Sequence, residues 1–334
     1  MKRFVRAATT SQSLSLAAME EASRLGRREA DIEHLFLALV MSDQSAGHAL
    51  RELGVDLDDA RRAVEGQHEA QLAALGVEAS FPEAGRIVFH ETDGYEWSKR
   101  AVDILSRSAA RGKSGDAAAV LRELLAEPSG LIAEILDRLG VTPAQVLAQL
   151  EHTRADTHAS LPAPAAQRGR GSGSTEVFVP APKQAVWSLL ADPARIPEWE
   201  SSIGSVEPGS GENDGKDAVP GAAWQAHAPV IYPDGKPAKI KPPFRRRRIE
   251  LISCEAPSAI IWGLGFPDVP QSSRVLTEFR LVTVTGGTQL RITRSWTRRR
   301  GWRGLVALPM RPLQRFIVWI GLFQVGSAVT RAFR

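Results

Sequence analysis

The chain has 334 residues, of which 43% are hydrophobic and 24% are charged, with a net charge of +4. This composition excludes collagen-like and strongly disordered classes, and the length predicts about two domains. A single cysteine, Cys254, excludes an internal disulfide framework and a multi-cysteine metal site. No apolar run follows the basic residues 1–6, and the uncharged stretch 316–330 is too short to span a membrane. We expect no signal peptide and a cytoplasmic, soluble protein.

Charge and composition differ between the two halves of the chain. Residues 1–151 hold 17 basic and 24 acidic side chains, whereas residues 152–334 hold 25 and 14. At the junction, residues 158–174 are rich in Pro, Ala, Gly and Ser. Such a segment buries too little apolar surface to offset its ordering entropy, so we expect a flexible tether. We therefore predict one domain over 1–151, a linker over 152–174 and a second domain over 175–334.

The first half contains an internal repeat with helical periodicity. Apolar residues recur at helical spacing over 14–25, and Gly26 follows that run, where helices commonly end. At an offset of 86 residues the landmarks return, so that Leu-Gly-Val at 53–55 corresponds to Leu-Gly-Val at 139–141. A fixed offset indicates a duplicated helical unit, and we expect both copies to pack into one all-α domain.

Three segments of the first copy carry a resemblance. They are Ala-Ser-Arg-Leu-Gly at 22–26, Ile-Glu-His-Leu-Phe-Leu-Ala-Leu at 32–39 and Ala-Leu-Arg-Glu-Leu-Gly-Val-Asp at 49–56. Together they resemble the Clp repeat, the tandem all-α domain at the N-terminus of Clp-type unfoldases. The resemblance implies a domain that docks a protein partner, with Glu33 and His34 as candidate docking residues. In some members of the family an acidic residue of each repeat binds phosphorylated arginine, and Glu33 stands at that position.

Both copies depart from the family pattern. Ala119 and Val120 stand where Glu33 and His34 stand in the first copy, and Ile32 replaces the usual threonine. Phosphoarginine binding is therefore not expected from this sequence. The alternatives for the first copy are a buried or helix-capping histidine and an acidic residue that interacts with the helix dipole.

The sequence contains no P-loop, which an ATP-dependent unfoldase requires. Gly-Lys-Ser at 112–114 has Arg107 where the motif needs a glycine, and Gly-Lys-Asp at 215–217 lacks the upstream glycine and the hydroxyl residue. A Clp-like domain in this chain would act as a detached docking module.

The second half alternates apolar and polar residues, as strands of a half-buried sheet do. Gly286 and Gly287 lie between two such segments and predict a hairpin turn. These features predict an α+β domain in which an antiparallel sheet wraps round a long C-terminal helix. The predicted strands are 175–179, 204–207, 222–230, 249–254, 259–263, 275–284 and 290–296, and the predicted helices are 182–191, 193–199 and 313–332.

Three further segments carry a second resemblance. They are Val-Pro-Ala-Pro at 179–182, Val-Trp-Ser-Leu-Leu-Ala-Asp-Pro at 186–193 and Ile-Pro-Glu-Trp at 196–199. With the order of elements, they resemble the START-like SRPBCC superfamily, in particular its polyketide cyclase/dehydrase and lipid-transport branch. The resemblance implies a helix-grip fold whose long helix and curved sheet enclose an apolar pocket. Members of the superfamily include carriers, sensors and a few enzymes, and the fold does not choose among them.

Six residues of the second half are candidates for the wall of this pocket. Tryptophans bury a large apolar area and often line ligand cavities. A histidine beside a carboxylate or an arginine could add a polar spot, although such side chains can also face solvent or satisfy one another. The six are Trp224, His227, Trp262, Glu278, Arg291 and Trp296.

Arginines cluster at 245–248 and 298–300. They are interpreted as a charged sheet edge or as a surface for anionic lipid headgroups, supported by Trp302, Phe316 and Trp319. Nucleic acid is the third interpretation and is ranked last, since no nucleic-acid-binding motif accompanies the charge.

These observations favour a non-enzymatic protein, because neither a Ser-His-Asp arrangement nor an HExxH motif is present. Its START-like pocket would hold a hydrophobic or aromatic small molecule or a lipid, and residues 1–151 would dock a protein partner. The alternative is a cyclase- or dehydratase-like enzyme with the Clp-like domain as a targeting module. We expect no cofactor and no metal.

Overall fold

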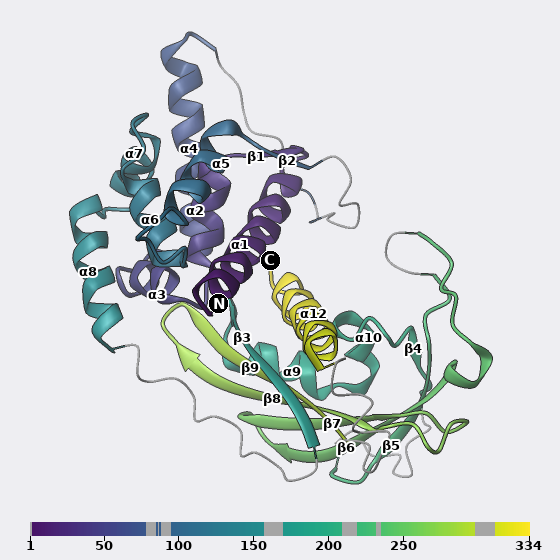
Figure 1. The fold of residues 1–334 in the computed structure, drawn as a ribbon. Helices are drawn as coiled ribbons and strands as arrows, with labels where there is room; N and C mark the ends of the chain where they lie inside the picture. The colour runs from purple at the N-terminus through teal and green to yellow at the C-terminus, as the bar shows by residue number, and fades with distance from the viewer. Residues whose placement is uncertain are drawn as a thin grey trace. The chain divides into compact units, whose positions relative to one another are not determined.

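The computed structural model describes residues 2–77, 85, 87, 95–156, 170–208, 219–231, 235–297 and 311–334 (Figure 1). The chain divides into two compact units, residues 1–160 and 161–334. The described part of the expected linker 152–174 is not irregular: residues 152–156 continue a helix, and residues 170–174 begin a strand. That strand extends the predicted one by pairing along its whole length with its neighbour. Residues 157–169 lie outside the described part of the chain.

The first unit is helical and contains one short two-stranded parallel sheet. Its core is formed by residues that lie between Leu14 and Leu150 in the sequence. Its described elements are α1 (Lys2–Arg24), β1 (Glu29–Ala30), α2 (Ile32–Val40), α3 (Ser45–Glu52), α4 (Leu57–Ala74), β2 (Glu96–Trp97), α5 (Lys99–Ser108), α6 (Ala117–Leu125), α7 (Leu131–Arg138) and α8 (Pro143–Asp156).

The helices repeat at the predicted offset. The starts of α3 and α4, at residues 45 and 57, correspond to the starts of α7 and α8, at residues 131 and 143. Glycines at equivalent positions have positive φ: Gly54 has φ +82° and Gly140 has φ +70°. Left-handed glycine ends a helix at low steric cost, so both copies turn in the same way between their last two helices.

The second unit combines one sheet with helices. Its described elements are β3 (Arg170–Val179), α9 (Lys183–Ala191), the 3-10 turn η1 (Pro193–Arg195), α10 (Ile196–Trp199), β4 (Ser205–Val206), β5 (Ala223–His227), the 3-10 turn η2 (Pro242–Phe244), β6 (Arg246–Glu255), β7 (Ala259–Gly265), β8 (Val275–Val284), β9 (Gly287–Thr297) and α12 (Arg311–Arg331).

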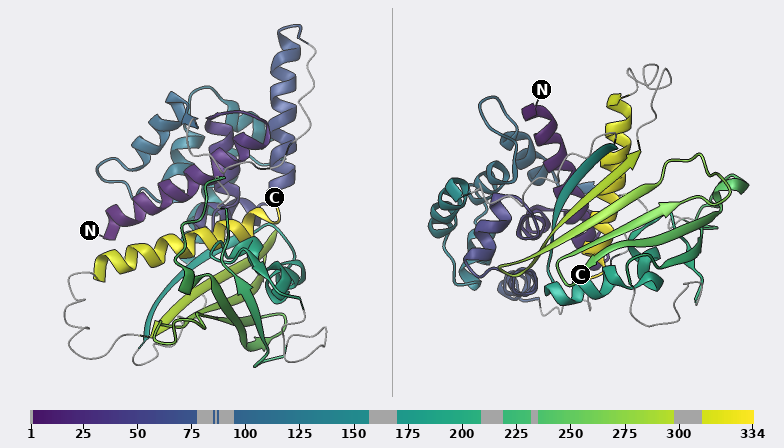
Figure 2. Two further views of the ribbon diagram at one scale, coloured as in Figure 1. Left: turned by 90° about the vertical axis from the view of Figure 1, so that its right-hand side faces the viewer. Right: turned by 90° about the horizontal axis from the view of Figure 1, so that it is seen from below.

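The sheet is antiparallel throughout and has the strand order β3-β9-β8-β7-β6-β5-β4. Figure 2 shows α12 lying across one face of this sheet. The expected helix-grip arrangement is therefore confirmed, and the hairpin between β8 and β9 turns at Gly286, which has φ +78°. Strand β6 begins three residues earlier than predicted and lies between β5 and β7. The arginines at 246–248 are consequently not at a sheet edge.

Candidate functional site

One face of the sheet is turned toward α12, and we call it the inner face. A Cβ atom added to Gly173 of β3 would lie 2.8 Å from Val318 Cγ1 of α12, and one added to Gly326 of α12 would lie 2.7 Å from Val177 Cγ1 of β3. Because successive side chains alternate between faces, these contacts identify the inner positions of every paired strand. The inner positions of β9 include Ile292, which also packs near Gly326.

The strand register aligns a row of residues across the inner face. Leu251 of β6 pairs with Trp262 of β7, and Trp262 pairs with Thr277 of β8. Thr277 pairs with Arg294 of β9, and Arg294 pairs with Gly173 of β3. The row therefore runs from an aliphatic and an aromatic side chain to a hydroxyl and a guanidinium.

Two tryptophans form the aromatic end of this face. The rings of Trp224 and Trp262 meet edge to face, with centroids 5.7 Å apart and planes at 62°. Trp262 is buried, and its indole Nε1 donates a 2.9 Å hydrogen bond to the carbonyl oxygen of Leu190 at the end of α9. Trp224 is only partly buried. The pair thus presents one fixed ring and one accessible ring.

The third predicted tryptophan lies at an inner position of β9. Trp296 pairs with Val275 of β8 and with Gly171 of β3. Its indole covers Gly171 so closely that an added Cβ atom would lie 2.6 Å from Trp296 Cε2. The three tryptophans predicted for the pocket wall therefore all lie on the inner face.

An ion pair lies at the other end of the row. Arg294 Nη2 contacts Glu200 Oε2, and the exposed fractions of the two side chains are 18% and 9%. Glu200 caps the C-terminus of α10 and also accepts a 3.2 Å hydrogen bond from the backbone N–H of Ser202. On the helix side, a Cβ atom added to Gly321 of α12 would lie 2.9 Å from Arg294 Nη1. The guanidinium is held between β9, α10 and α12.

Three donors, which belong to Arg294 or to residues within two positions of Glu200 in the sequence, have no hydrogen-bond partner among the described residues. They are Trp199 Nε1, Ser202 Oγ and Arg294 Nε, and all three atoms are buried. Trp199 is 3% exposed and packs edge-on against Phe279 of β8, with ring centroids 5.0 Å apart. Buried donors are nearly always satisfied in folded proteins, so this group needs an acceptor. We call Trp199, Glu200, Ser202 and Arg294 the polar cluster.

Sequence reasoning missed the polar cluster, although a signal for it was present. Arg294 occupies an inner position of β9 between Ile292 and Trp296, where alternation calls for an apolar residue. An arginine inside an otherwise apolar series is the pattern that could have identified it.

The three polar residues predicted for the pocket lie on the opposite face. His227 Nε2 pairs with Glu207 Oε1 at 2.6 Å. Glu278 Oε1 accepts a 2.5 Å hydrogen bond from Arg280 Nε. On β9, Arg291 alternates with the buried Leu290 and Ile292, and its Nε donates to Glu176 Oε1 at 2.8 Å. Strand alternation therefore separates all three from the tryptophans, which corrects the expected polar spot.

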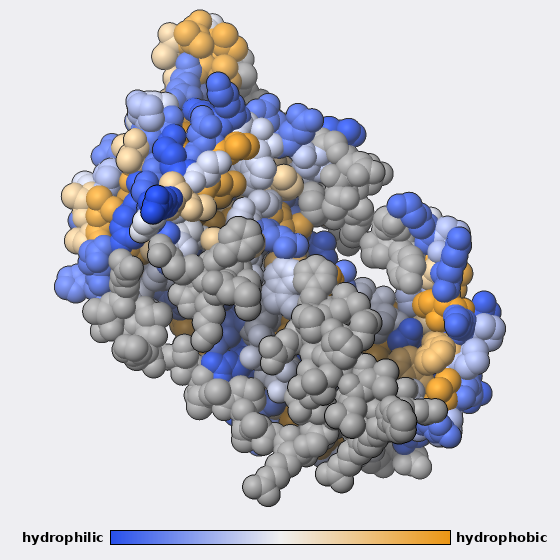
Figure 3. All heavy atoms as spheres, viewed as in Figure 1, coloured by the Kyte–Doolittle hydropathy of each residue, from blue (hydrophilic) through white to orange (hydrophobic). Residues whose placement is uncertain are grey.

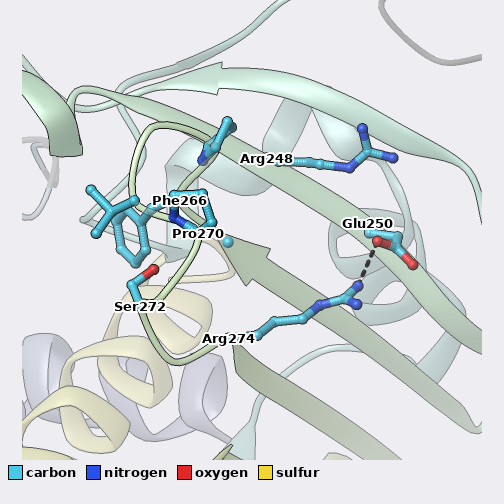
Figure 4. Close-up of a pocket in the computed structure, with 9 residues that line it drawn as sticks. Arg248, Glu250, Phe266, Pro270, Ser272 and Arg274 are labelled. Carbon is cyan, nitrogen blue, oxygen red and sulfur yellow. Dashed lines mark ion pairs between the residues drawn. The ribbon is translucent and has the colours of Figure 1, made fainter.

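A pocket of about 310 Å³ opens on this opposite face, between β6 and the loop that follows β7 (Figure 4). Arg248, Glu250, Phe266 and Arg274 are among the residues that line it. Arg274 reaches across the pocket to Glu250, with Nη2 2.6 Å from Oε2. Because Glu250 and Arg274 neutralise each other, the pocket offers an incoming ligand little uncompensated charge beyond that of Arg248.

One arginine of the 245–248 run lies on the inner face. Arg247 is 8% exposed and pairs in register with Ala226 of β5. Its guanidinium carbon lies 5.2 Å from the centre of the Phe266 ring. The ring of Phe266 packs edge to face against the ring of Phe244, and the two ring centroids are 5.4 Å apart. The contact is a cation–π interaction, and it joins the start of β6 to the end of β7. The arginines at 298–300 lie outside the described residues.

In the first unit, the candidate docking residues Glu33 and His34 are buried, each 2% exposed. His34 belongs to the cap of α2, because its Nδ1 accepts a 3.2 Å hydrogen bond from the backbone N–H of Asp31. A partner protein does not reach either side chain in this conformation. The helix-capping alternative for His34 agrees with this geometry.

Glu33 is surrounded by histidine and arginine side chains. His34 Nδ1 and His68 Nε2 each lie 3.5 Å from Glu33 Oε1, and Arg27 and Arg100 lie within 3.9 Å of the carboxylate. Burial alone would raise the pKa of Glu33, but the imidazoles of His68 and His34 outweigh it, and the pKa is lowered. Burial lowers the pKa of His34. The fold thus favours a charged Glu33 and a neutral His34.

Among the described residues, no cluster of His, Cys, Asp and Glu is arranged to hold a metal ion. No helix in the described part of the chain has both the length and the apolarity needed to cross a bilayer. Cys254 is partly buried, and burial raises the pKa of its thiol.

The fold places the chain in a class of two-unit proteins, in which a mainly helical unit with a duplicated pattern precedes a helix-grip domain. Residues 170–317 match the family model described as polyketide cyclase / dehydrase and lipid transport, and residues 8–84 match the Clp repeat (R) N-terminal domain. The chain therefore carries a Clp N-terminal repeat and, after it, a polyketide cyclase/dehydrase-like domain. No curated protein matches the chain.

Several solved structures resemble the second half. A protein from Chromobacterium violaceum is 15% identical, with a TM-score of 0.32, over 48% of this chain and 96% of its own. A polyketide cyclase-like protein from Corynebacterium glutamicum is 17% identical, with a TM-score of 0.33, over 50% and 93%. A Staphylococcus aureus protein of unknown function is 12% identical, with a TM-score of 0.35, over 49% and 94%. Likeness at this level carries no information about ligand or reaction.

Proposed function

We propose that the second unit binds an apolar, aromatic small molecule between the inner face of its sheet and α12. The observation that carries the proposal is the row that links Trp262 to Arg294 across two strand spacings, with Trp224 beside it. A few polar groups within an otherwise apolar and aromatic lining are typical of small-molecule sites. The family match of residues 170–317 supports the same role.

The test is ligand retention by the full chain. Native mass spectrometry of the purified protein, followed by organic extraction, is expected to release an apolar molecule. Trp224→Ala is expected to lose this molecule, because it removes the accessible ring of the pair. Gln225→Ala is the matched control, since Gln225 is the next residue of β5 and is exposed. A chain that carries no molecule and binds none of a panel of aromatic compounds and lipids would contradict the proposal.

An enzyme of cyclase or dehydratase type is the competing role. The buried ionisable groups of the polar cluster are already paired, Arg294 with Glu200. Acid–base catalysis needs a group that exchanges a proton with substrate. Chemical change in the extracted molecule during incubation with the purified chain would favour the enzyme over the binding protein.

For the first unit we propose protein docking, as its Clp repeat suggests. The end of α4 offers an exposed apolar surface, where Leu75 is 78% and Val77 is 47% exposed (Figure 3). Exposed apolar groups of this kind commonly mark interaction sites. A photo-crosslinking residue at Leu75 is expected to trap a defined protein that the same residue at Leu147, on α8, does not trap. Equal capture at both positions, or none, would contradict this role for α4.

A further inference from the structure

Two glycines leave a trough on the face of the sheet that is turned away from α12. Gly263 and Gly265 occupy successive positions of β7 on this face, where they pair in register with Glu250 and Arg248 of β6. A Cβ atom added to Gly265 would have one described neighbour within 4 Å, the carbonyl oxygen of Arg248 at 4.0 Å. Because β7 places no side chain here, the pocket of about 310 Å³ opens between β6 and the loop 266–274 (Figure 4). We call it the outer pocket.

Two ion pairs hold this loop against β6. Near its start, Asp268 Oδ1 lies 3.1 Å from Arg246 Nη2. At its end, Arg274 Nη2 lies 2.6 Å from Glu250 Oε2. Arg248 stands between these two ion pairs on the same side of β6, and no carboxylate among the described residues pairs with it. It supplies the uncompensated positive charge of the outer pocket.

The loop gives the pocket an apolar wall of defined shape. Its backbone is folded by two hydrogen bonds, from the N–H of Val269 to the carbonyl oxygen of Phe266 at 3.0 Å and from the N–H of Ser272 to the carbonyl oxygen of Val269 at 2.8 Å. Proline rings restrict the backbone further. Figure 4 shows the ring of Phe266 on the loop side of the pocket and the guanidinium of Arg248 on the β6 side. The apolar lining residues of the loop are Phe266, Pro267, Val269 and Pro270.

Charge and size together select a ligand class. The planar guanidinium of arginine matches a carboxylate, which can accept two parallel hydrogen bonds from it. A second negative charge on the ligand would meet no further uncompensated cation among the described lining residues and would lie near the Glu250 carboxylate. The volume is at the lower end of the range for ligand pockets, about 300–1,000 Å³, which favours a small molecule.

We propose that the outer pocket binds a small monocarboxylate whose body is a single apolar ring, with the carboxylate on Arg248 and the ring against the apolar wall of the loop. This site lies on the opposite face of the sheet from the one assigned under the proposed function. Its test therefore neither depends on that function nor decides it.

Three phenyl compounds of similar size test the proposal by NMR titration of the full chain. They are 3-phenylpropionate, 3-phenylpropanamide and 2-phenylethylphosphonate in its dianionic form. The readout is the backbone amide signals of Gly265 and Ser272, which line the outer pocket. We expect 3-phenylpropionate to shift these signals and to bind about fivefold more tightly than the amide, the gain of a charge-assisted over a neutral hydrogen bond. The phosphonate should bind more weakly than 3-phenylpropionate.

Two variants assign the binding to the pocket. Arg248→Met keeps an aliphatic stem but removes the charge, so the preference for the carboxylate over the amide should fall to about twofold or less. Arg280→Met is the matched control, because Arg280 is half-exposed on the same face of β8, pairs with Glu278 and does not line the pocket. Gly265→Val fills the trough at a position where the structure has space for a side chain, and binding of all three compounds should be lost while the thermal midpoint is kept.

Four results would overturn the proposal. The outer pocket is not a binding site if 3-phenylpropionate leaves the Gly265 and Ser272 signals unmoved, or shifts them equally in Gly265→Val. Equal affinity for the carboxylate and the amide would remove the carboxylate from the ligand class, and tightest binding of the phosphonate would replace it by a dianion. A preference that persists in Arg248→Met would mean that another group holds the charge.

Discussion

The buried guanidinium of Arg51 donates hydrogen bonds to backbone carbonyl oxygens at the C-terminal end of α2. Arg51 is 2% exposed, and its Nη1 donates to the carbonyl oxygens of Val40 at 2.5 Å and Ser42 at 3.0 Å. The last carbonyls of a helix have no donor within that helix. Arg51→Met leaves both buried acceptors without this donor, and we expect the free energy of unfolding of the first unit to fall by about 3 kcal/mol.

Native-state hydrogen exchange of the α2 amides measures this effect. The control is Arg62→Met, because the Arg62 side chain is 68% exposed and, within the described part of the chain, pairs with Asp59 of the same helix and with no other carboxylate. Exposed pairs of this kind contribute less than about 1 kcal/mol. If both substitutions had the same small effect, Arg51 would not be the group that satisfies the end of α2.

The environment of Glu33 makes the first unit sensitive to acid. The folded pKa of Glu33 lies below its ordinary value of 4.5, since His68 and His34 outweigh the effect of burial. The unfolded chain therefore binds more protons, and the stabilisation present above pH 4.5 is lost as the pH falls through the folded pKa. Burial lowers the pKa of His34 below 6.5, which acts in the same direction at higher pH. The protection factors of the α2 amides, which are corrected for the intrinsic exchange rate at each pH, should fall on acidification from pH 7.

Glu33→Gln tests the carboxylate's share of this pH dependence. The variant should show a smaller loss of protection below pH 4.5 than the unmodified chain, while the loss at higher pH, assigned to His34, should remain. Glu69→Gln, on the exposed side of α4, is the control and should follow the unmodified chain. An unchanged acid profile in Glu33→Gln would place the acid-sensitive group elsewhere.

At the scale of elements, the duplicated helical pattern predicts equal effects at equivalent turns. Gly54 and Gly140 have φ of +82° and +70°, and a Cβ atom at either position would have no neighbour within 4 Å. An alanine there is strained by the backbone alone, so Gly54→Ala and Gly140→Ala should each destabilise the first unit by about 1 kcal/mol. Gly66→Ala, inside α4, should stabilise it by a similar amount, because alanine favours helix. Urea denaturation followed at 222 nm measures all three, and unequal effects at the two turns would contradict the structural equivalence.

The packing of α12 on the sheet depends on glycine. A Cβ atom at Gly326 would lie 2.7 Å from Val177 Cγ1, and valine is too stiff to move aside. Gly326→Val should therefore destabilise the second unit by about 2 kcal/mol and weaken retention of the bound molecule. Gln324→Val, at an exposed position of the same helix, is the control. Thermal unfolding measures the difference, and equal midpoints would show that α12 does not rest on β3.

Local patterns predicted the elements better than they predicted the site. Strand β8 has the predicted bounds, 275–284, and the predicted hairpin after it turns at Gly286. The polar cluster could not be predicted in the same way, because Glu200 and Arg294 are 94 residues apart and meet only through the sheet topology. His227 is three residues from Trp224, an odd separation that puts the two side chains on opposite faces.

At the scale of the whole molecule, the amino-acid composition differs between the two halves of the chain, and each half has its own hydrophobic core. One cluster of buried apolar residues lies between residues 14 and 150, and the other between residues 179 and 329. The change of net charge and the Pro, Ala, Gly and Ser-rich segment lie between them in sequence. The bounds of the linker depend on how far α8 and β3 continue, which composition does not encode.

Two separate cores predict two separate responses to core substitutions. Leu50 and Leu251 are each 0% exposed, the first in the helical core and the second in the core of the sheet unit. Removing a buried leucine side chain costs about 3 kcal/mol, of which the cavity left behind is a part. Leu50→Ala should speed hydrogen exchange in α2 and leave β8 unchanged, and Leu251→Ala should do the reverse. Because each unit buries its own apolar surface, the loss stays in the unit where the cavity forms. Faster exchange in α2 and β8 alike after either substitution would mean that the chain unfolds as one cooperative structure, and the division into a docking unit and a binding unit would then have no thermodynamic basis.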